Sequence, residues 1–485
     1  MNTMNEDSKS LPSAWISIIP LIVLIAMISM TITLFGSDAL SGGNQVSLFI
    51  ATGVCVTLSM LIYKTKWQTI EDNIKHTIGD ASVSIVILII IGMLGGSWMI
   101  SGVVPTLIYY GVQTMSPQFF LVSACIICAI VSLMTGSSWT TVATIGLAML
   151  GIGDALGIPE AWTAGAIISG AYFGDKMSPM SDTTILAASM AGTDLFTHIR
   201  YMMYTTVPTI SITLIIFLCA GFGFGNSSDI NVTEYTEGLA NTFNISLWTL
   251  IVPLFSAILI MKKIPSMITL FASSLLAGIM SLILQQDILL EIAGETIPSA
   301  MNLVKGVMIS FFTSTNVETG NATLNELVST GGMAGMMDTI WLILCAMCFG
   351  ASMVATGMLF SIIKVIMTFI RNTFGLVSAT VCSGILLNVM TGDQYISIIL
   401  SADMYKKMYK DMGLEARLLS RSCEDSATVT SVLIPWNTCG MTQATVLGVP
   451  TIAYLPYCFF NYISPLMTCF MALIGYKIKK TTVKA

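Results

Sequence analysis

The segment GDKMSPMSDTT, residues 174–184, places three ionisable side chains and a proline inside a run that is otherwise apolar. The ionisable residues are Asp175, Lys176 and Asp182, and Pro179 lies among them. Charge inside a lipid bilayer costs free energy, so it usually marks a functional site. Proline removes a backbone hydrogen bond and interrupts a helix. We therefore expect an interrupted membrane helix that carries an ion site at this segment.

The composition of the whole chain places this segment in a membrane protein. The 485 residues are 55% apolar and only 9% charged, and the mean hydropathy is +0.84. These values exclude a set of soluble domains and predict an all-α polytopic protein in the lipid bilayer. The 11 cysteines lie mostly in apolar runs without the spacing of a zinc site, so we expect no cofactor. We also expect no nucleic-acid partner.

An internal repeat divides the chain into two halves. Thr135-Gly136 and Thr391-Gly392 are 256 residues apart, and so are Pro179 and Pro435. Just upstream, GGSWMISG (95–102) matches GASMVATG (350–357) at a separation of 255 residues. We expect a first repeat at residues 1–225, an outer linker at 226–245 and a second repeat at 246–485.

The apolar runs predict the topology of each half. Two pairs of short runs, 117–134 with 138–153 and 375–390 with 393–405, are joined by Thr-Gly turns and are expected to form re-entrant hairpins. Each half then has about five crossings, one of them interrupted, and the odd count inverts the second half. Lys and Arg test this count, because they concentrate on the cytoplasmic side of membrane proteins. With both termini in the cytoplasm, only Lys305 among the residues outside the interrupted helices falls on the outer side.

Both predicted interruptions are rich in oxygen ligands. Oxygen atoms suit a small hard cation, and the ends of a broken helix attract ions. At the first break these residues are Asp175, Ser178, Ser181, Asp182 and Thr183, and at the second they include Glu424, Asp425, Thr428 and Asn437. The tips of the two hairpins add Ser137, Ser138 and Asp393 if the halves fold symmetrically.

Structural roles compete with ion binding at several of these positions. Asp175 and Lys176 could form an ion pair within the helix bundle, and Asp425 lies four residues after Arg421, the spacing of an intrahelical pair. Asp393 could be only a local helix cap.

The motifs resemble those of the NhaC-type sodium/proton antiporter family, within the ion transporter superfamily. The resemblance rests on GDKMSPMSDTT with its flanking SGAYF and AASMAGTDLFTHI, and on TGSSW, TGDQY and EDSATVTSVLIPWNTCG. It implies two inverted repeats and a transport domain that slides against a scaffold. Carried over by motif position, it implies ion-binding roles for Asp175, Ser178, Ser181, Asp182, Thr183, Asp393, Asp425 and Asn437. We add Thr135 and Ser137, at the tip of the first hairpin, to the expected ion-binding residues. We hypothesise that Asp175 and Asp182 bind sodium, and that Lys176 balances the charge of whichever does not exchange.

The expected function is secondary active transport in the cell membrane, in which cytoplasmic sodium is exchanged for external protons. Burial favours the protonated form of a carboxylate, so sodium and protons can compete for one site. The alternative is sodium- and proton-coupled exchange of small organic acids such as malate and lactate, as in some members that resemble this chain. A small organic anion as an additional substrate and a homodimeric assembly are further alternatives.

One short motif would fit an enzyme instead of a transporter. Gly151-Ile152-Gly153-Asp154 fits the GxGD pattern of intramembrane aspartyl proteases. That chemistry needs a second membrane aspartate, usually after a tyrosine, and the sequence contains no Tyr-Asp pair. We therefore expect a transporter and no enzymatic activity.

Overall fold

The computed structural model describes residues 11–35, 42–224, 232–320 and 322–478. Within these ranges the chain is helical and has no strand, apart from one isolated bridge between Thr315 and Thr330. The prediction of an all-α protein is therefore confirmed for the described residues. Parts of the predicted halves and linker, residues 1–10, 36–41, 225–231, 321 and 479–485, lie outside them.

The helices of the first 225 residues include one break, at Pro179. Their bounds are α1 Ala14–Ser17, α2 Ile19–Phe35, α3 Gly43–Tyr63, α4 Trp67–Ile100, α5 Val103–Thr114, α6 Pro117–Thr135, α7 Ser138–Thr141, the π-helix η2 Val142–Gly146, α8 Leu147–Ala155, α9 Glu160–Met177, α10 Asp182–Ala191 and α11 Leu195–Phe224.

The helices of the remaining chain include a second break, at Pro435. Their bounds are α12 Val232–Thr242, η3 Leu247–Leu250, α13 Ile251–Met261, α14 Ser266–Leu284, α15 Gln286–Ala293, α16 Ala300–Phe312, α17 Ala322–Val328, η4 Ala334–Met336, α18 Met337–Ala355, α19 Met358–Met367, α20 Thr373–Thr391, α21 Gln394–Asp411, α22 Ala416–Cys423, the π-helix η5 Glu424–Thr428, η6 Ser431–Leu433, α23 Thr438–Leu447, α24 Thr451–Tyr454, η7 Leu455–Tyr457 and α25 Phe459–Leu473.

Many of these helices are long and apolar enough to cross a membrane. Eight of them in the described residues meet that condition, and a ninth span results if the bent pair Tyr235–Thr242 and Leu247–Met261 is counted as one. The shorter α25 and the two interrupted helices fall outside this count by length or polarity. The protein is therefore a multi-pass membrane protein.

The helix bounds of the two halves correspond to each other. Both bounds of α6 lie 256 residues before those of α20, and both bounds of α10 lie 256 residues before those of α23. The start of α9 precedes the start of α22 by the same number of residues. The joined segment α7–η2–α8 corresponds in the same way to α21. Both turns between the hairpin helices are glycines in the left-handed region, Gly136 with φ +66° and Gly392 with φ +67°. A side chain at either position would be strained, which accounts for the repeated Thr-Gly turn.

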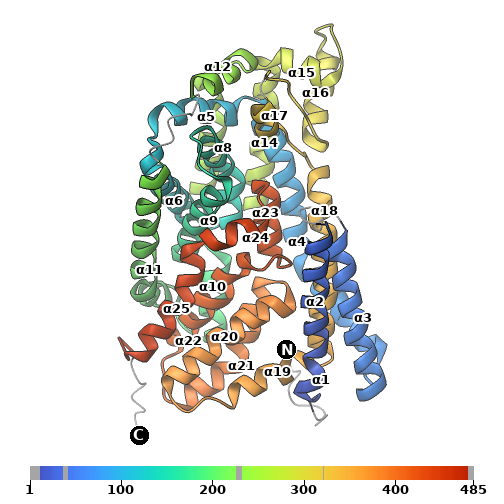
Figure 1. The fold of residues 1–485 in the computed structure, drawn as a ribbon, viewed down its shortest axis with the longest axis vertical. Helices are drawn as coiled ribbons and strands as arrows, with labels where there is room; N and C mark the ends of the chain where they lie inside the picture. Colours follow the sequence, from blue (N-terminus) through green and yellow to red (C-terminus); the bar gives the residue numbers. More distant parts are fainter. Residues whose placement is uncertain (1–10, 36–41, 225–231, 321, 479–485) are drawn as a thin grey trace.

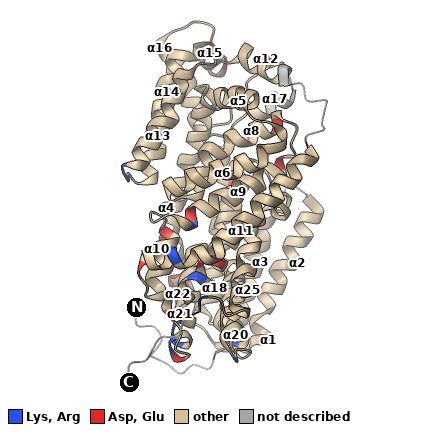
Figure 2. Ribbon diagram, turned by 90° about the vertical axis from the view of Figure 1, so that its left-hand side faces the viewer, with Lys and Arg blue, Asp and Glu red and all other residues tan. Residues whose placement is uncertain are grey.

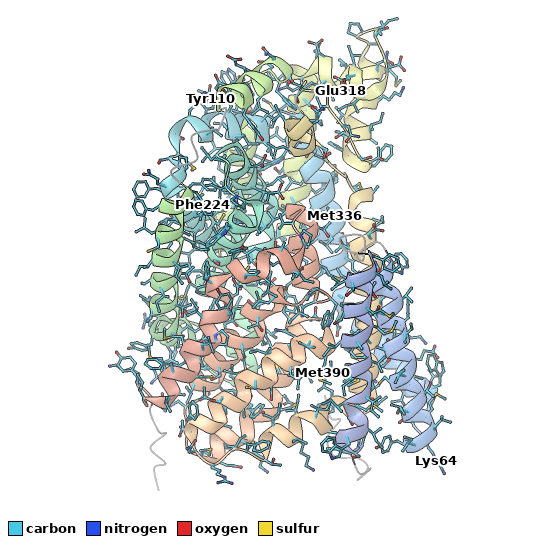
Figure 3. The ribbon with its side chains drawn as sticks, viewed as in Figure 1. Lys64, Tyr110, Phe224, Glu318, Met336 and Met390 are labelled. Atoms are coloured by element: carbon cyan, nitrogen blue, oxygen red, sulfur yellow. The ribbon has the colours of Figure 1, made fainter. Side chains whose placement is uncertain are left out.

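The arrangement in space separates the corresponding elements. In both views the hairpin of α6 and α8 lies above the hairpin of α20 and α21 (Figures 1 and 2). Lys64 marks the lower end of the molecule, whereas Tyr110 and Glu318 lie at the upper end (Figure 3). Lys and Arg lie mainly in the lower half (Figure 2).

Close helix packing holds the first interrupted helix in place. A Cβ atom at Gly170 would overlap the carbonyl oxygen of Cys125, and one at Gly174 would overlap that of Ala129. Gly170 and Gly174 are therefore the face on which α9 approaches the backbone of α6. Small residues at this spacing allow membrane helices to pack closely where the hydrophobic effect supplies little driving force.

Candidate functional site

The first break is a four-residue segment, Ser178 to Ser181, between α9 and α10. Ser178 Oγ accepts a hydrogen bond from Met180 N at 3.2 Å, and Ser181 Oγ accepts one from Thr184 N at 3.4 Å as the N-cap of α10. Thr184 Oγ1 donates to the carbonyl of Lys176 at 3.1 Å, which satisfies one acceptor left free by the break. The hydroxyls of this segment thus replace the helical hydrogen bonds that Pro179 removes.

The tip of the first hairpin packs against this break. A Cβ atom at Gly136 would lie 2.7 Å from the backbone of Met180, so only glycine fits between the two segments. Beside it, Ser138 donates to Asp175 Oδ2 twice, from its backbone N at 3.1 Å and from Oγ at 2.8 Å. Asp175 is 7% exposed. The turn of the hairpin therefore delivers two donors to the buried carboxylate.

Thr135 and Ser137 shape the tip and do not themselves hydrogen-bond to Asp175. Thr135 Oγ1 donates to the carbonyl of Ser137 at 3.2 Å, and Ser137 Oγ caps the next helix by accepting from Thr140 N at 3.2 Å. Of the hydroxyl residues at this tip, Ser138 is the one that hydrogen-bonds to Asp175.

Asp182 differs from Asp175 in its surroundings. It is exposed in the first turn of α10, and it lies within electrostatic range of Asp175. The neighbouring hydroxyls of Ser181 and Thr183 share a hydrogen bond of 3.0 Å. The carboxylate of Asp175 is thus buried, whereas that of Asp182 is exposed. Both lie together with the other predicted residues of the first break, Ser178, Ser181 and Thr183.

Glu424 joins this group from the second half of the chain, although the sequence singled out Asp425 as the acid there. Glu424 is fully buried, and its Oε1 accepts a hydrogen bond from Thr183 Oγ1 at 3.3 Å. Its Oε2 has no hydrogen-bond partner among the described residues. Glu424 is also within electrostatic range of Asp175 and Lys176. The sequence signal for Glu424 was its position directly before Asp425, as a second acid in an apolar run.

Asp425 is instead held by an ion pair and hydroxyls. Lys176 Nζ contacts Asp425 Oδ1, and both side chains are fully buried. Ser464 donates to the same oxygen at 3.4 Å, while Thr205 donates to Oδ2 at 2.8 Å and Thr468 is a further donor there. Both oxygens of Asp425 are therefore occupied by protein donors in this structure.

This pairing corrects two predicted alternatives. Lys176 pairs with Asp425 rather than with its neighbour Asp175. Arg421 does not pair with Asp425, because the chain between them passes into the π-helix Glu424–Thr428, which changes the register on which an i,i+4 pair depends. The guanidinium of Arg421 lies 4.5 Å from the centre of the Tyr201 ring, and none of its nitrogens has a hydrogen-bond partner in the described chain.

The second break, between η6 and α23, contacts the tip of the second hairpin. Thr438 N donates to the carbonyl of Gly392 at 2.8 Å, and Thr438 Oγ1 donates to Asp393 Oδ2 at 3.3 Å. Asp393 Oδ1 caps α21 by accepting from Ile396 N at 3.0 Å. Asn437 caps α23 and donates to the carbonyl of Asn388 at 3.2 Å. Asp393 therefore has the predicted capping role and also bonds to the break.

The donor set at both breaks is carboxylate, hydroxyl and carbonyl oxygen. In the described part of the chain no group of three or more His, Cys, Asp or Glu residues could hold a metal ion. Hydroxyl and carbonyl oxygens are ligands that a small hard monovalent cation accepts.

Comparison with known proteins gives a consistent result. The profile of the Na⁺/H⁺ antiporter family matches residues 170–476. The Na⁺/H⁺ antiporter NhaC of Bacillus subtilis is 36% identical over 438 residues, 90% of this chain and 92% of the relative, and that of Alkalihalophilus pseudofirmus is 36% identical over 430 residues, 88% and 90%. The malate-2H⁺/Na⁺-lactate antiporter of Bacillus subtilis is 35% identical over 480 residues, 98% of each chain. As the sequence motifs predicted, the chain belongs to the Na⁺/H⁺ antiporter family.

Proposed function

We propose that this chain exchanges cytoplasmic sodium for external protons by alternating access. The observation that carries the proposal is the meeting of acids from both halves at the first break. Asp175 lies under the tip of the first hairpin, and Glu424 reaches the same place from the second half through Thr183. A carboxylate buried without a bonded cation is costly, so a proton or a sodium ion lowers the free energy of the site.

The charges inside the described chain support binding of more than one cation. The buried acids are Asp175, Asp393, Glu424 and Asp425, the buried lysine and arginine are Lys176 and Arg421, and the buried imidazole of His198 is left out of the count as a neutral ring. If all six are ionised, two negative charges remain unbalanced. Two monovalent cations, sodium ions or protons in either combination, would neutralise the core while it moves across the membrane.

We assign the ligands of the proposed sites by these contacts. The first site uses Asp175, Asp182, Ser178, Ser181 and Thr183, with Ser138 and Glu424 added. The second uses Asp393 and Asn437 beside Thr438. Thr135 and Ser137 support the first hairpin tip, and Asp425 serves as the partner of Lys176.

The finer architecture belongs to the same proposal. We propose two inverted repeats of about five crossings each, with re-entrant hairpins at α6–α8 and α20–α21 that enter from opposite faces of the cell membrane. The corresponding helix bounds support a repeat, and the separation of the two hairpins in Figures 1 and 2 supports opposite entry. The gathering of Lys and Arg in the lower half supports cytoplasmic termini (Figure 2).

The test is exchange by purified protein in liposomes that contain no organic anion. A sodium gradient should drive proton movement against the proton gradient, and the Asp175→Asn variant should abolish it. A passive channel would not move protons uphill.

A second candidate function is supported by the malate-2H⁺/Na⁺-lactate relative, which aligns over 98% of this chain. In that case sodium-driven proton movement would be absent until malate or lactate is added to the liposomes. The same preparation therefore decides between the two functions.

A further inference from the structure

A cavity of about 180 Å³ lies between α18 and α23, next to the second break. Its wall includes Pro435 of the break, Gly335 and Asp338 near the start of α18, and Ala444 of α23. Met336, which follows Gly335 in the chain, is labelled in Figure 3 and shows the reader where the cavity lies. The cavity thus lies beside the backbone that forms one of the two proposed cation sites.

The cavity extends from an exposed rim to a buried floor. Asp338 and Gly335 are exposed, whereas Thr339 is 5% exposed. At the floor the hydroxyls of Thr339 and Thr445 are hydrogen-bonded to each other, which joins α18 to α23. Two hydroxyl oxygens and one carboxylate therefore line the same cavity as Pro435 of the break.

The lining of the cavity carries negative charge and no positive charge among the described residues. Asp338 is the sole charged residue among the described residues that line the cavity. An organic acid would need a basic partner for its carboxylate, and this wall offers none. A cation would instead be attracted by Asp338 and could exchange part of its water shell for hydroxyl oxygens.

We propose that this cavity is a vestibule for monovalent cations, sodium or hydronium, and that Asp338 sets its preference for cations over anions. The inference rests on the proposed exchange function and deepens it, because it assigns an access route and a selecting residue. Asp338 does not belong to either proposed binding site. Its removal should therefore change cation access and leave the exchange step intact.

The first experiment measures accessibility and does not depend on transport. In an Ala444→Cys variant, a cationic methanethiosulfonate reagent should react faster than an anionic reagent of similar size. The carboxylate of Asp338 attracts the cationic reagent and repels the anionic one, so Asp338→Asn should reduce the ratio of the two rates about fivefold. The parent chain, with its own exposed Cys219 and Cys382, gives the background.

A matched control separates this effect from a general loss of surface charge. Asp287 is also an exposed acid in the first turn of a helix, α15, but it does not line the cavity. Asp287→Asn should leave the ratio of the two rates unchanged. Equal rates for the two reagents in the Ala444→Cys chain, or a ratio insensitive to Asp338→Asn, would overturn the proposal.

The second experiment follows exchange in proteoliposomes. Asp338→Asn should raise the half-saturating sodium concentration two- to threefold at low ionic strength without changing the maximal rate, and added choline chloride should remove the difference. If the half-saturating sodium concentration is unchanged in liposomes that exchange normally, the vestibule proposal is wrong and the proposed exchange function stands. If the unmodified chain shows no exchange, the proposed function fails, and the labelling experiment still decides on the vestibule.

Discussion

Lys176 of α9 and Asp425 of the π-helix Glu424–Thr428 form an ion pair that joins the two halves of the chain across 249 residues of sequence. Neither side chain is exposed. A buried ion pair need not add stability over an apolar pair, but the loss of one partner leaves an uncompensated charge. The pair therefore makes the docking of α9 on the second half depend on both residues being present.

The first prediction concerns this pair. Lys176→Met should lower the free energy of unfolding by about 3–5 kcal/mol, because Asp425 would remain charged and buried. The double variant Lys176→Met with Asp425→Asn should recover most of this loss, since Thr205 and Thr468 can still bond to the amide. Unfolding midpoints in detergent measure both changes. A single variant as stable as the unmodified chain would show that the pair does not hold the halves together.

The positions of the breaks and hairpin turns could be predicted from sequence, whereas the partner of Lys176 could not. Pro179, Pro435 and the two Thr-Gly turns act locally, through a missing N–H group and a left-handed glycine, so the residues themselves specify them. The pairing of Lys176 depends on tertiary packing between the halves. The i,i+4 rule failed at Arg421 and Asp425 because it assumes α-helical register, which the π-helix interrupts. Glu424 was expected only among the oxygen ligands of the second break, because its contact with Thr183 at the first break also depends on tertiary packing.

The second prediction concerns Arg421, whose guanidinium is buried without a bonded acceptor in the described chain. Arg421→Met keeps much of the side-chain volume and contact with Tyr201 and removes the charge. We expect the free energy of unfolding to stay the same or to rise by about 1–4 kcal/mol, measured by the unfolding midpoint. A clear destabilisation would mean that an acidic partner faces Arg421 in another conformation of the transporter.

The third prediction concerns the contact between Ser138 and Asp175. Ser138→Ala removes the hydroxyl donor at 2.8 Å and keeps the backbone donor at 3.1 Å. The loss of one hydroxyl interaction worth about 1 kcal/mol should raise the half-saturating sodium concentration about fivefold, while Asp175→Asn should abolish exchange. Sodium titrations of proton movement in liposomes measure both. If Asp175→Asn and Asp182→Asn each retain exchange, the first site is assigned wrongly.

The fourth prediction tests Glu424, the acid that sequence reasoning did not select. Glu424→Gln keeps the shape of the side chain and the contact with Thr183 but removes one negative charge from the buried core. With one cation fewer to be bound, the exchange rate at a fixed sodium gradient should fall at least tenfold, which corresponds to about 1.4 kcal/mol.

A neighbouring acid supplies the control for Glu424. Glu415 is half-buried and pairs with Arg417, with its Oε2 2.5 Å from Arg417 Nη2 and away from both breaks in sequence. Glu415→Gln should leave the exchange rate within about twofold, because a partly exposed ion pair contributes little. Equal effects of the two substitutions would indicate a general loss of stability rather than a role of Glu424 in cation binding.

The last prediction concerns the glycine face on which α9 meets α6. Gly170→Ala would place a methyl group against the carbonyl oxygen of Cys125, a backbone atom that cannot turn aside. The helices would have to separate, which should cost about 1–3 kcal/mol and shift Asp175 away from Ser138.

Gly53 in α3 and Gly223 in α11 are matched controls, because a Cβ atom at either would meet no atom within 4 Å. Alanine there should be neutral or stabilise the helix by up to about 1 kcal/mol. Unfolding midpoints of the three variants distinguish a packing effect at Gly170 from a general response to alanine, and the proposed close approach fails if Gly170→Ala behaves like the controls.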